Sequence, residues 1–210
     1  MADASRIAIC IPSGDMVHTD FAISLGVMLA RLGVQRIPCA LYNMKTTILS
    51  KGRQSLVNQA LASGHSHVLF LDSDMTFPAD TAVRLLAHDL DIVGVAAATR
   101  RDGALMSSAQ KRWGERLDIA ANDGLVEVDY LGFGGVLIRT DVFRKIAKPW
   151  FPIEFRGPDS EGRDTWTGED YGFCGKARAA GFRVHVDTAL SFEFGHLGQK
   201  AFRLQDIPDN

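Results

Sequence analysis

Two aspartates separated by one residue follow an apolar run in the first half of the chain. Residues 68–71 read VLFL, and Asp72-Ser73-Asp74 comes directly after them. Ligands of open α/β sheets lie beyond the carboxyl ends of strands, so we expect both carboxylates there. Like charges so placed repel unless a cation lies between them, and a hard divalent ion that also grips a diphosphate would satisfy both. The structural alternative is that Asp72 caps the loop and Asp74 is solvated.

Short motifs follow one another in order along residues 53–196. They are Arg53 in a helical segment, VLFLDSDMTFP at 68–78, LGFGGVLIR at 131–139, GEDYGF at 168–173, and His196 after a glycine. In this order they resemble motifs of the glycosyltransferases with the GT-A fold, above all the family-2-like group. The matching motifs are the Arg-Asn helix, the DxD segment, the glycine-rich acceptor-side loop, the xED segment and the late metal-ligand histidine.

The resemblance implies a single α/β domain with the GT-A fold, the Rossmann-like fold of nucleotide-diphospho-sugar transferases. Its central sheet is mainly parallel, flanked by helices, with a small antiparallel part. Residues 1–98 would form the nucleotide-binding half, 99–196 the acceptor and catalytic half, and 197–210 a C-terminal lid. The implied activity is that of a metal-dependent glycosyltransferase of the hexosyltransferase type, which moves a sugar to an acceptor hydroxyl. Inversion is favoured, and retention stays open.

The resemblance also implies a metal site at Asp72, Asp74 and His196, with Asp74 and His196 as direct ligands and Asp72 in contact with the ribose or, through water, with the metal. Mixed carboxylate and imidazole ligands suit Mn²⁺ well and Mg²⁺ less so. Such an ion would stabilise the diphosphate as a leaving group. For His196, the structural alternative is a buried or loop histidine with a satisfied hydrogen bond. For Arg53, it is an arginine on a helix surface. The residues expected to bind the donor are Arg53, Asp72, Ser73, Asp74 and Lys200.

Catalysis is expected at Asp170 and Glu169, the two carboxylates of the xED-like segment. An inverting transferase needs a carboxylate to accept the proton of the acceptor hydroxyl, and we assign this role to Asp170. The spacing does not determine which of the two faces the acceptor, and acidic residues in a first helical turn are also common caps. The residues expected to contact sugar or acceptor are Gly132, Gly134, Gly135 and Trp166, with a glycine bend or bulge and an edge-of-core tryptophan as alternatives.

The elements that must position these residues follow from hydrophobic periodicity. Strands are predicted over 6–11, 35–42, 67–71, 91–96, 135–138 and 183–186. Helices are predicted over 19–32, 50–63, 78–88, 141–147 and 170–180. Residues 104–129 read as short strands and turns with a hairpin turn at 122–124, and the polar, glycine-containing stretch 155–167 reads as a loop. Strand–helix alternation in the first half indicates a parallel sheet.

Composition is that of an ordinary globular domain. The chain has 210 residues, of which 46% are hydrophobic and 23% charged, and its net charge is −2. A membrane span needs about 20 apolar residues, which no segment supplies. The start of the chain does not resemble a signal peptide, and the three cysteines lie in apolar settings, so a cytoplasmic location is expected. Overall acidity argues against a basic nucleic-acid binder.

The partner is expected to be a nucleotide-diphospho-sugar, with a UDP-sugar favoured. Residues 41–45 read LYNMK where the family has Asp-Asp-Gly-Ser, so recognition of the base stays open. The acceptor could be a glycan, a lipid-linked sugar, a protein or a modified nucleic-acid base, and the oligomeric state is open. One alternative function is a nucleotidyltransferase, which the missing basic loop after the first strand argues against. The other is a non-catalytic donor-binding subunit.

Overall fold

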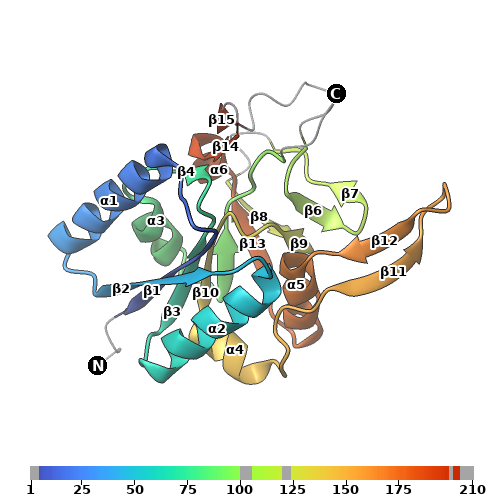
Figure 1. Cartoon of the computed structure of the whole chain (residues 1–210), viewed down its shortest axis with the longest axis horizontal. Coiled ribbons are helices and arrows are strands. Elements are labelled where there is room, and N and C mark those ends of the chain that lie inside the picture. Colours follow the sequence, from blue (N-terminus) through green and yellow to red (C-terminus); the bar gives the residue numbers. More distant parts are fainter. Residues whose placement is uncertain (1–4, 100–105, 120–123, 199–200, 204–210) are drawn as a thin grey trace.

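The computed structural model describes residues 5–99, 106–119, 124–198 and 201–203, and it is an α/β structure (Figure 1). Seven strands form the central sheet, in the order β2 (Cys39–Lys45), β1 (Ile7–Ser13), β3 (His67–Leu71), β10 (Gly135–Arg139), β5 (Ile92–Gly94), β13 (Val184–Asp187) and β8 (Leu125–Val128). The helices are α1 (Thr19–Val34), α2 (Leu49–Ala62), α3 (Thr81–Ala87), α4 (Thr140–Lys145), α5 (Glu169–Ala179) and α6 (Thr188–Glu193).

The central sheet is mixed and mostly parallel, as expected. Strand β1 pairs in parallel with β2 and β3, and β13 pairs in parallel with β5. Strand β10 lies antiparallel between β3 and β5, and β8 lies antiparallel on the edge next to β13. Five of the seven strands therefore point the same way, and their carboxyl ends share one edge of the sheet.

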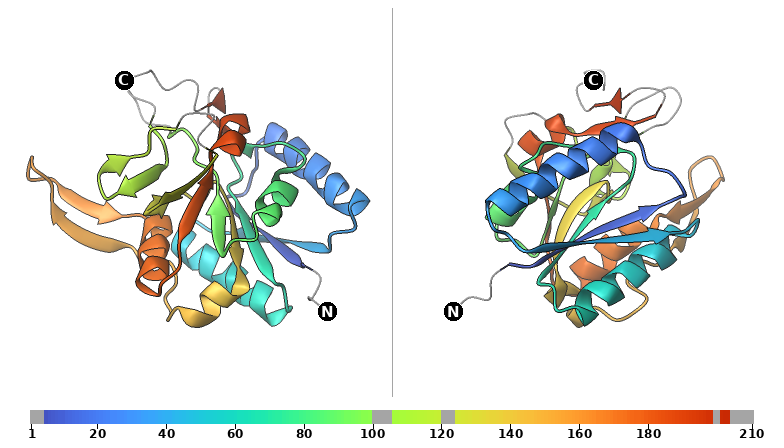
Figure 2. Two further views of the ribbon diagram at one scale, coloured as in Figure 1. Left: turned by 180° about the vertical axis from the view of Figure 1, so that it is seen from behind. Right: turned by 60° about the vertical axis from the view of Figure 1, so that its left-hand side comes forward.

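Helices cover both faces of this sheet, which explains why its central strands are apolar throughout. One hydrophobic core lies against α2, α4 and α5, and the other lies against α1, α3 and α6. Figure 2 shows α1 and α2 on opposite faces of the sheet. Among the residues that the structure describes, no helix is both long and apolar enough to cross a membrane.

Three small sheets complete the structure. The first joins β4 (Met75–Thr76), β14 (Gly195–Leu197) and β15 (Ala201–Phe202), and the second joins β6 (Ala109–Arg112), β7 (Glu115–Arg116) and β9 (Tyr130–Leu131). The third is a hairpin of β11 (Glu154–Pro158) and β12 (Asp164–Thr167). The predicted turn at 122–124 lies mostly outside the described residues.

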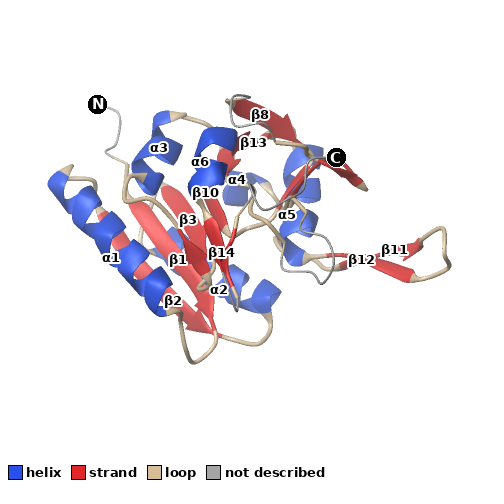
Figure 3. Cartoon of the chain, turned by 90° about the horizontal axis from the view of Figure 1, so that it is seen from above, coloured by secondary structure: helices blue, strands red, loops and turns tan. Residues whose placement is uncertain are grey.

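The hairpin β11–β12 corrects the prediction of a loop over 155–167. Its strands pair antiparallel with Phe155 opposite Trp166, and it projects from the body of the molecule (Figure 3). Most of its side chains are exposed on both faces. It therefore lacks the alternation of apolar and polar residues by which a half-buried strand is recognised.

Several element boundaries also differ from the predicted ones. Helix α1 continues past Gly33 to Val34, and β2 begins only at Cys39, because a turn containing Arg36 at φ 56° separates them. Helix α3 begins at Thr81, because Pro78 belongs to the preceding turn, in which its carbonyl accepts the Thr81 amide at 3.2 Å. The strand expected over 67–71 is confirmed.

Candidate active site

The Asp72-Ser73-Asp74 segment lies at the carboxyl end of β3, as its sequence position predicts. The amide of Asp72 donates to the carbonyl of Gly134, which precedes β10, at 3.3 Å. The segment then enters β4, which pairs antiparallel with β14 so that Met75 lies opposite His196. This pairing brings the DxD-like segment and the late histidine to one edge of the sheet. Asp74 and His196 are 122 residues apart along the chain.

Asp74 and His196 face one another. Nε2 of His196 lies 3.5 Å from Oδ2 of Asp74, and both side chains are largely buried. Nδ1 of His196 lies 2.7 Å from the carbonyl oxygen of Ala98, and because a carbonyl only accepts, Nδ1 carries the proton. In the neutral ring Nε2 is then an acceptor aimed at a carboxylate, which is the orientation of a metal-binding imidazole. This donor set fits a divalent cation.

Asp72 does not join that pair. Its Oδ1 accepts from Nη2 of Arg53 at 2.8 Å. Burial raises the pKa of Asp72, Arg53 opposes that rise, and Asp74 adds to it. Within the described part of the chain, no three His, Cys, Asp or Glu side chains gather as a metal cluster. The two expected direct ligands, Asp74 and His196, thus lie together, whereas Asp72, expected to contact the ribose or the metal through water, is paired with Arg53.

Arg53 lies beneath the site and not on the surface of α2. Its side chain is 2% exposed, and its Nε donates to Oε1 of Glu169 at 3.1 Å. Its guanidinium lies 5.1 Å from the ring centroid of Phe70 and 5.5 Å from that of Phe133. Burial lowers the pKa of Arg53, but Asp72 and Glu169 outweigh it, so the pKa lies above its ordinary value. Arg53 thus connects the DxD-like and xED-like segments.

The two carboxylates of the xED-like segment point to different places. Glu169 is turned to Arg53, whereas Asp170 lines a pocket. Oδ1 of Asp170 accepts the amide of Tyr171 at 2.7 Å. Burial and the negative charge of Glu169 raise the pKa of Asp170 to about 7, although the Tyr171 amide opposes the rise. A carboxylate with such a pKa, set in a pocket, is typical of a catalytic acid or base.

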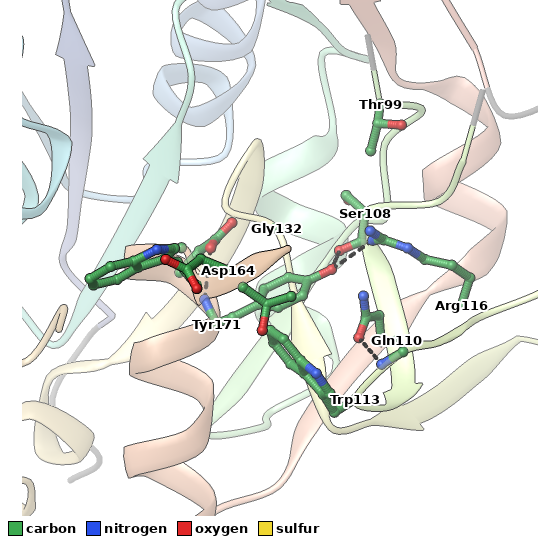
Figure 4. Close-up of a pocket in the computed structure, with 13 residues that line it drawn as sticks. Thr99, Ser108, Gln110, Trp113, Arg116, Gly132, Asp164 and Tyr171 are labelled. Carbon is green, nitrogen blue, oxygen red and sulfur yellow. Dashed lines mark hydrogen bonds between the residues drawn. The ribbon is translucent and has the colours of Figure 1, made fainter. Parts of the chain in front are cut away.

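The pocket beside Asp170 has a volume of about 580 Å³ (Figure 4). Arg116 donates to the Tyr171 hydroxyl at 2.9 Å, and this hydroxyl donates to the carbonyl of Ser108 at 3.0 Å. Burial raises the pKa of Tyr171 to about 12, so the hydroxyl stays neutral. The lining residues are Thr99, Ser108, Gln110, Trp113, Gly114, Arg116, Gly132, Asp164, Thr165, Trp166, Gly168, Asp170 and Tyr171.

Trp166 lines this pocket, but Gly134 and Gly135 do not. A Cβ on Gly135 would lie 2.7 Å from Cε1 of Phe194 and 2.9 Å from Cγ2 of Val95, so this glycine allows close packing inside the sheet. A Cβ on Gly134 would lie 3.2 Å from the sulfur of Met75. The geometry assigns these two glycines to packing, and Gly132 is the glycine of this loop that reaches the pocket.

Two expected donor-binding residues are less defined. The carbonyl of Ser73 accepts the amide of His18 at 3.4 Å, which holds the loop after β3 against the start of α1. Lys200 lies outside the described residues. Of the expected lid over 197–210, the structure describes residues 197–198 and 201–203, where β15 pairs with β14. The side chain of Arg203 lies against Gly195, since a Cβ on Gly195 would be 3.3 Å from Nη1 of Arg203.

Much of the pocket wall was not predicted from the sequence. Tyr171 directly follows Asp170, and a tryptophan before a glycine at Trp113 is typical of an exposed turn, so both positions carried a signal. Arg116 and Gln110 lie in a segment without recognisable periodicity, and nothing in the sequence indicates that they line the same pocket as Tyr171.

The architecture is similar to that of known structures. A197 from STIV has a TM-score of 0.64 at 17% identity and covers 98% of this chain and 94% of its own. A mutant of the Drosophila beta-1,4-galactosyltransferase 7, in complex with manganese, UDP-Gal and xylobiose, has a TM-score of 0.52 at 16% identity, with 92% and 71% covered. The structural similarity shows the fold, which is the α/β fold of GT-A glycosyltransferases. No family model and no curated protein matches the sequence.

Proposed function

We propose that this chain is a metal-dependent glycosyltransferase that moves a sugar from a nucleotide-diphospho-sugar to an acceptor hydroxyl with inversion. The observation that carries the proposal is the double contact of Arg53. It holds Asp72, on the donor side, and Glu169, next to Asp170, around one buried guanidinium. The segment that carries the expected metal ligand and the segment that carries the expected base are therefore held at the same edge of the sheet.

Asp74 and His196 are the proposed ligands of a Mn²⁺ or Mg²⁺ ion. The hydrogen bond from His196 to Ala98 orients the ring for this role. An ion held there would neutralise the diphosphate as it departs. The manganese and UDP-Gal in the similar galactosyltransferase structure support this choice of metal and of a UDP-sugar donor.

Asp170 is the proposed general base. Its carboxylate accepts the proton of the acceptor hydroxyl as that oxygen bonds to the anomeric carbon. The bond from the anomeric carbon to the phosphate oxygen breaks, and its electron pair leaves with the nucleoside diphosphate. A base with a pKa of about 7 combines a useful ionised fraction near neutral pH with strong proton affinity.

The first experiment measures thermal unfolding with UDP, GDP, CDP, dTDP and ADP, each with and without Mn²⁺. A ligand at 100 times its dissociation constant adds about 2.7 kcal/mol of stability. We expect one nucleotide to stabilise the protein only when Mn²⁺ is present. Asp74→Asn should abolish this shift, and Asp141→Asn, on the exposed face of α4, should keep it.

The outcomes separate the candidate functions. The same measurement is repeated with the five matching triphosphates, and stabilisation by a triphosphate but by none of the diphosphates would favour a nucleotidyltransferase. Metal-dependent nucleotide binding without transfer to any acceptor would indicate a donor-binding subunit. If neither nucleotide nor Mn²⁺ changes the midpoint, the glycosyltransferase proposal is wrong.

A further inference from the structure

The pocket beside Asp170 continues onto an aromatic surface of the β11–β12 hairpin. Trp166 lines the pocket and is 58% exposed. Its cross-strand partner Phe155 is 53% exposed, with the two ring centroids 5.1 Å apart. Phe155 does not line the pocket, and it lies on β11 directly across from Trp166, so it extends the aromatic surface beyond the pocket. A ligand longer than the pocket would therefore meet a second aromatic ring outside it.

A second tryptophan forms another wall of the pocket. Trp113 is 45% exposed and packs edge-on against Tyr171, with ring centroids 6.3 Å apart. The guanidinium of Arg156, on β11, lies 5.3 Å from the centroid of its ring. This contact joins the turn that carries Trp113 to the hairpin that carries Trp166, so the two aromatic walls are held in one arrangement.

The rest of the lining is polar and carries two carboxylates. Asp164 and Asp170 both line the pocket, together with the uncharged side chains of Thr99, Ser108 and Gln110 (Figure 4). Among the described residues that line the pocket, Arg116 is the one cationic side chain, and its Nη1 is directed to the Tyr171 hydroxyl and to the carbonyl of Ser107. Carboxylates repel an anionic ligand, and hydroxyl and amide groups do not suit a lipid tail.

A sugar ring matches this combination. It presents a face of C–H groups, which the electron-rich face of an aromatic ring attracts, and a rim of neutral hydroxyls that donate and accept hydrogen bonds. We propose that the acceptor is an uncharged oligosaccharide whose terminal sugar occupies the pocket between Trp113 and Trp166 and whose following sugars lie along Phe155. This inference rests on the proposed function and specifies its acceptor.

The three tryptophans of the chain provide a test that needs neither donor nor turnover. Trp150 is 3% exposed, and its indole donates to the carbonyls of Phe143 and Ile146, both at 3.0 Å. In a ¹H–¹⁵N spectrum its indole signal is an internal reference. We would titrate the protein with the tetramers of glucose (β-1,4 and α-1,4), N-acetylglucosamine and xylose, and with the matching monosaccharides.

We expect at least one tetramer to shift the indole signals of Trp113 and Trp166 and to leave that of Trp150 in place. Phe155→Ala should weaken binding of this tetramer about five- to tenfold, the loss of one stacked ring, and leave the monosaccharide unchanged. Leu41→Ala, an exposed substitution on the edge strand β2, is the matched control and should change neither.

The inference is overturned if no tetramer shifts the two signals, or if Phe155→Ala weakens monosaccharide and tetramer equally. It is also overturned if the anionic galacturonate tetramer or a serine-containing peptide binds in place of the neutral sugars. Nucleotide binding with Mn²⁺ is measured on the same sample. Nucleotide binding without sugar binding would reject only the proposed acceptor. Sugar binding without nucleotide binding would reject the glycosyltransferase proposal.

Discussion

The buried guanidinium of Arg53, on helix α2, forms an ion pair with the partly exposed carboxylate of Asp72 at the end of strand β3, with Nη2 2.8 Å from Oδ1. The same guanidinium contacts Glu169 at the start of α5 through its Nε. Its remaining nitrogen, Nη1, is buried and has no hydrogen-bond partner among the described residues. One cation therefore compensates carboxylates from two elements, and each of these depends on it for its position.

Removing this cation should be costly. Arg53→Met leaves two carboxylates without their partner, so we expect a loss of about 3–5 kcal/mol in the free energy of unfolding. Arg53→Lys keeps the charge but not both directed contacts, and should lose less. Urea unfolding measures both. The control Arg144→Met removes an exposed pair with Asp141 and should cost under about 1 kcal/mol. Equal costs for the two methionine variants would contradict the role given to Arg53.

Asp170→Asn should abolish transfer and leave metal-dependent nucleotide binding in place. A general base contributes about 10²–10⁴-fold to the rate, and that factor should be lost from kcat. In the unaltered protein the rate should rise with pH through about 7, because the carboxylate acts only when ionised. A variant that transfers at the normal rate, or a profile that is flat from pH 5 to 8, would remove Asp170 from this role.

The same substitution should stabilise the fold at alkaline pH. The pKa of Asp170 is about 7 in the folded state, against 3.8 for an unperturbed aspartate, so the folded state binds the proton more tightly. Stability contributed by this group is thus full below pH 4 and falls as pH rises through 7. One pKa unit corresponds to about 1.4 kcal/mol, so Asp170→Asn should gain roughly 2–4 kcal/mol at pH 8. Denaturant unfolding at pH 4 and pH 8 tests this, and a gain independent of pH would be inconsistent with it.

Gly135→Ala should destabilise the protein without a direct effect on acceptor binding. The added methyl would collide with Phe194 and Val95, and overpacking of this kind costs about 1–3 kcal/mol. Gly14→Ala is the matched control, because a Cβ there meets nothing within 4 Å. The midpoints of thermal unfolding separate the two. If Gly135→Ala raised the acceptor KM with an unchanged midpoint, the glycine would belong to the binding site after all.

His196→Gln should remove the stabilisation that Mn²⁺ gives in the presence of the nucleotide. The imidazole Nε2 faces Asp74, and the amide of glutamine reaches about the same place but is a weaker ligand for Mn²⁺ than an imidazole nitrogen. His88→Gln, which affects the pair of His88 with Asp187, is the control and should retain the shift. Addition of EDTA to the unaltered protein should give the same midpoint as His196→Gln. A metal-dependent shift that survives in His196→Gln would exclude this histidine from the site.

The sequence was sufficient for features that depend on local pattern. The apolar run His67–Leu71 followed by two aspartates predicted a buried strand with carboxylates at its end, and the structure has this arrangement. The acidic pair Glu169-Asp170 and the glycine Gly181 likewise predicted the start and the end of a helix, and α5 spans Glu169–Ala179. These features depend on neighbours within a few residues.

Features that depend on distant partners were not predictable. An arginine in a helix is expected at the surface. Arg53 can be buried because Asp72 and Glu169 compensate its charge, and these two residues lie 19 and 116 positions further along the chain. The role of Gly135 follows from contact with Phe194, on a different element. The hairpin that carries Phe155 was missed because it has no buried face.

The position of β10 has a consequence for synthesis of the chain. This strand lies between β3 and β5, so in a nascent chain of 98 residues one edge of β3 and both edges of β5 have no pairing strand. The hydrogen bonds that join β3 to β5 through β10 form only when residues 135–139 have emerged. The other edge of β5 is paired only when β13 has emerged. Long-range pairing of this kind is slow and leaves strand edges exposed to other chains. We expect a ribosome-bound chain to remain protease-sensitive until nearly its whole length is available, and the fragment 1–98 to aggregate when produced alone.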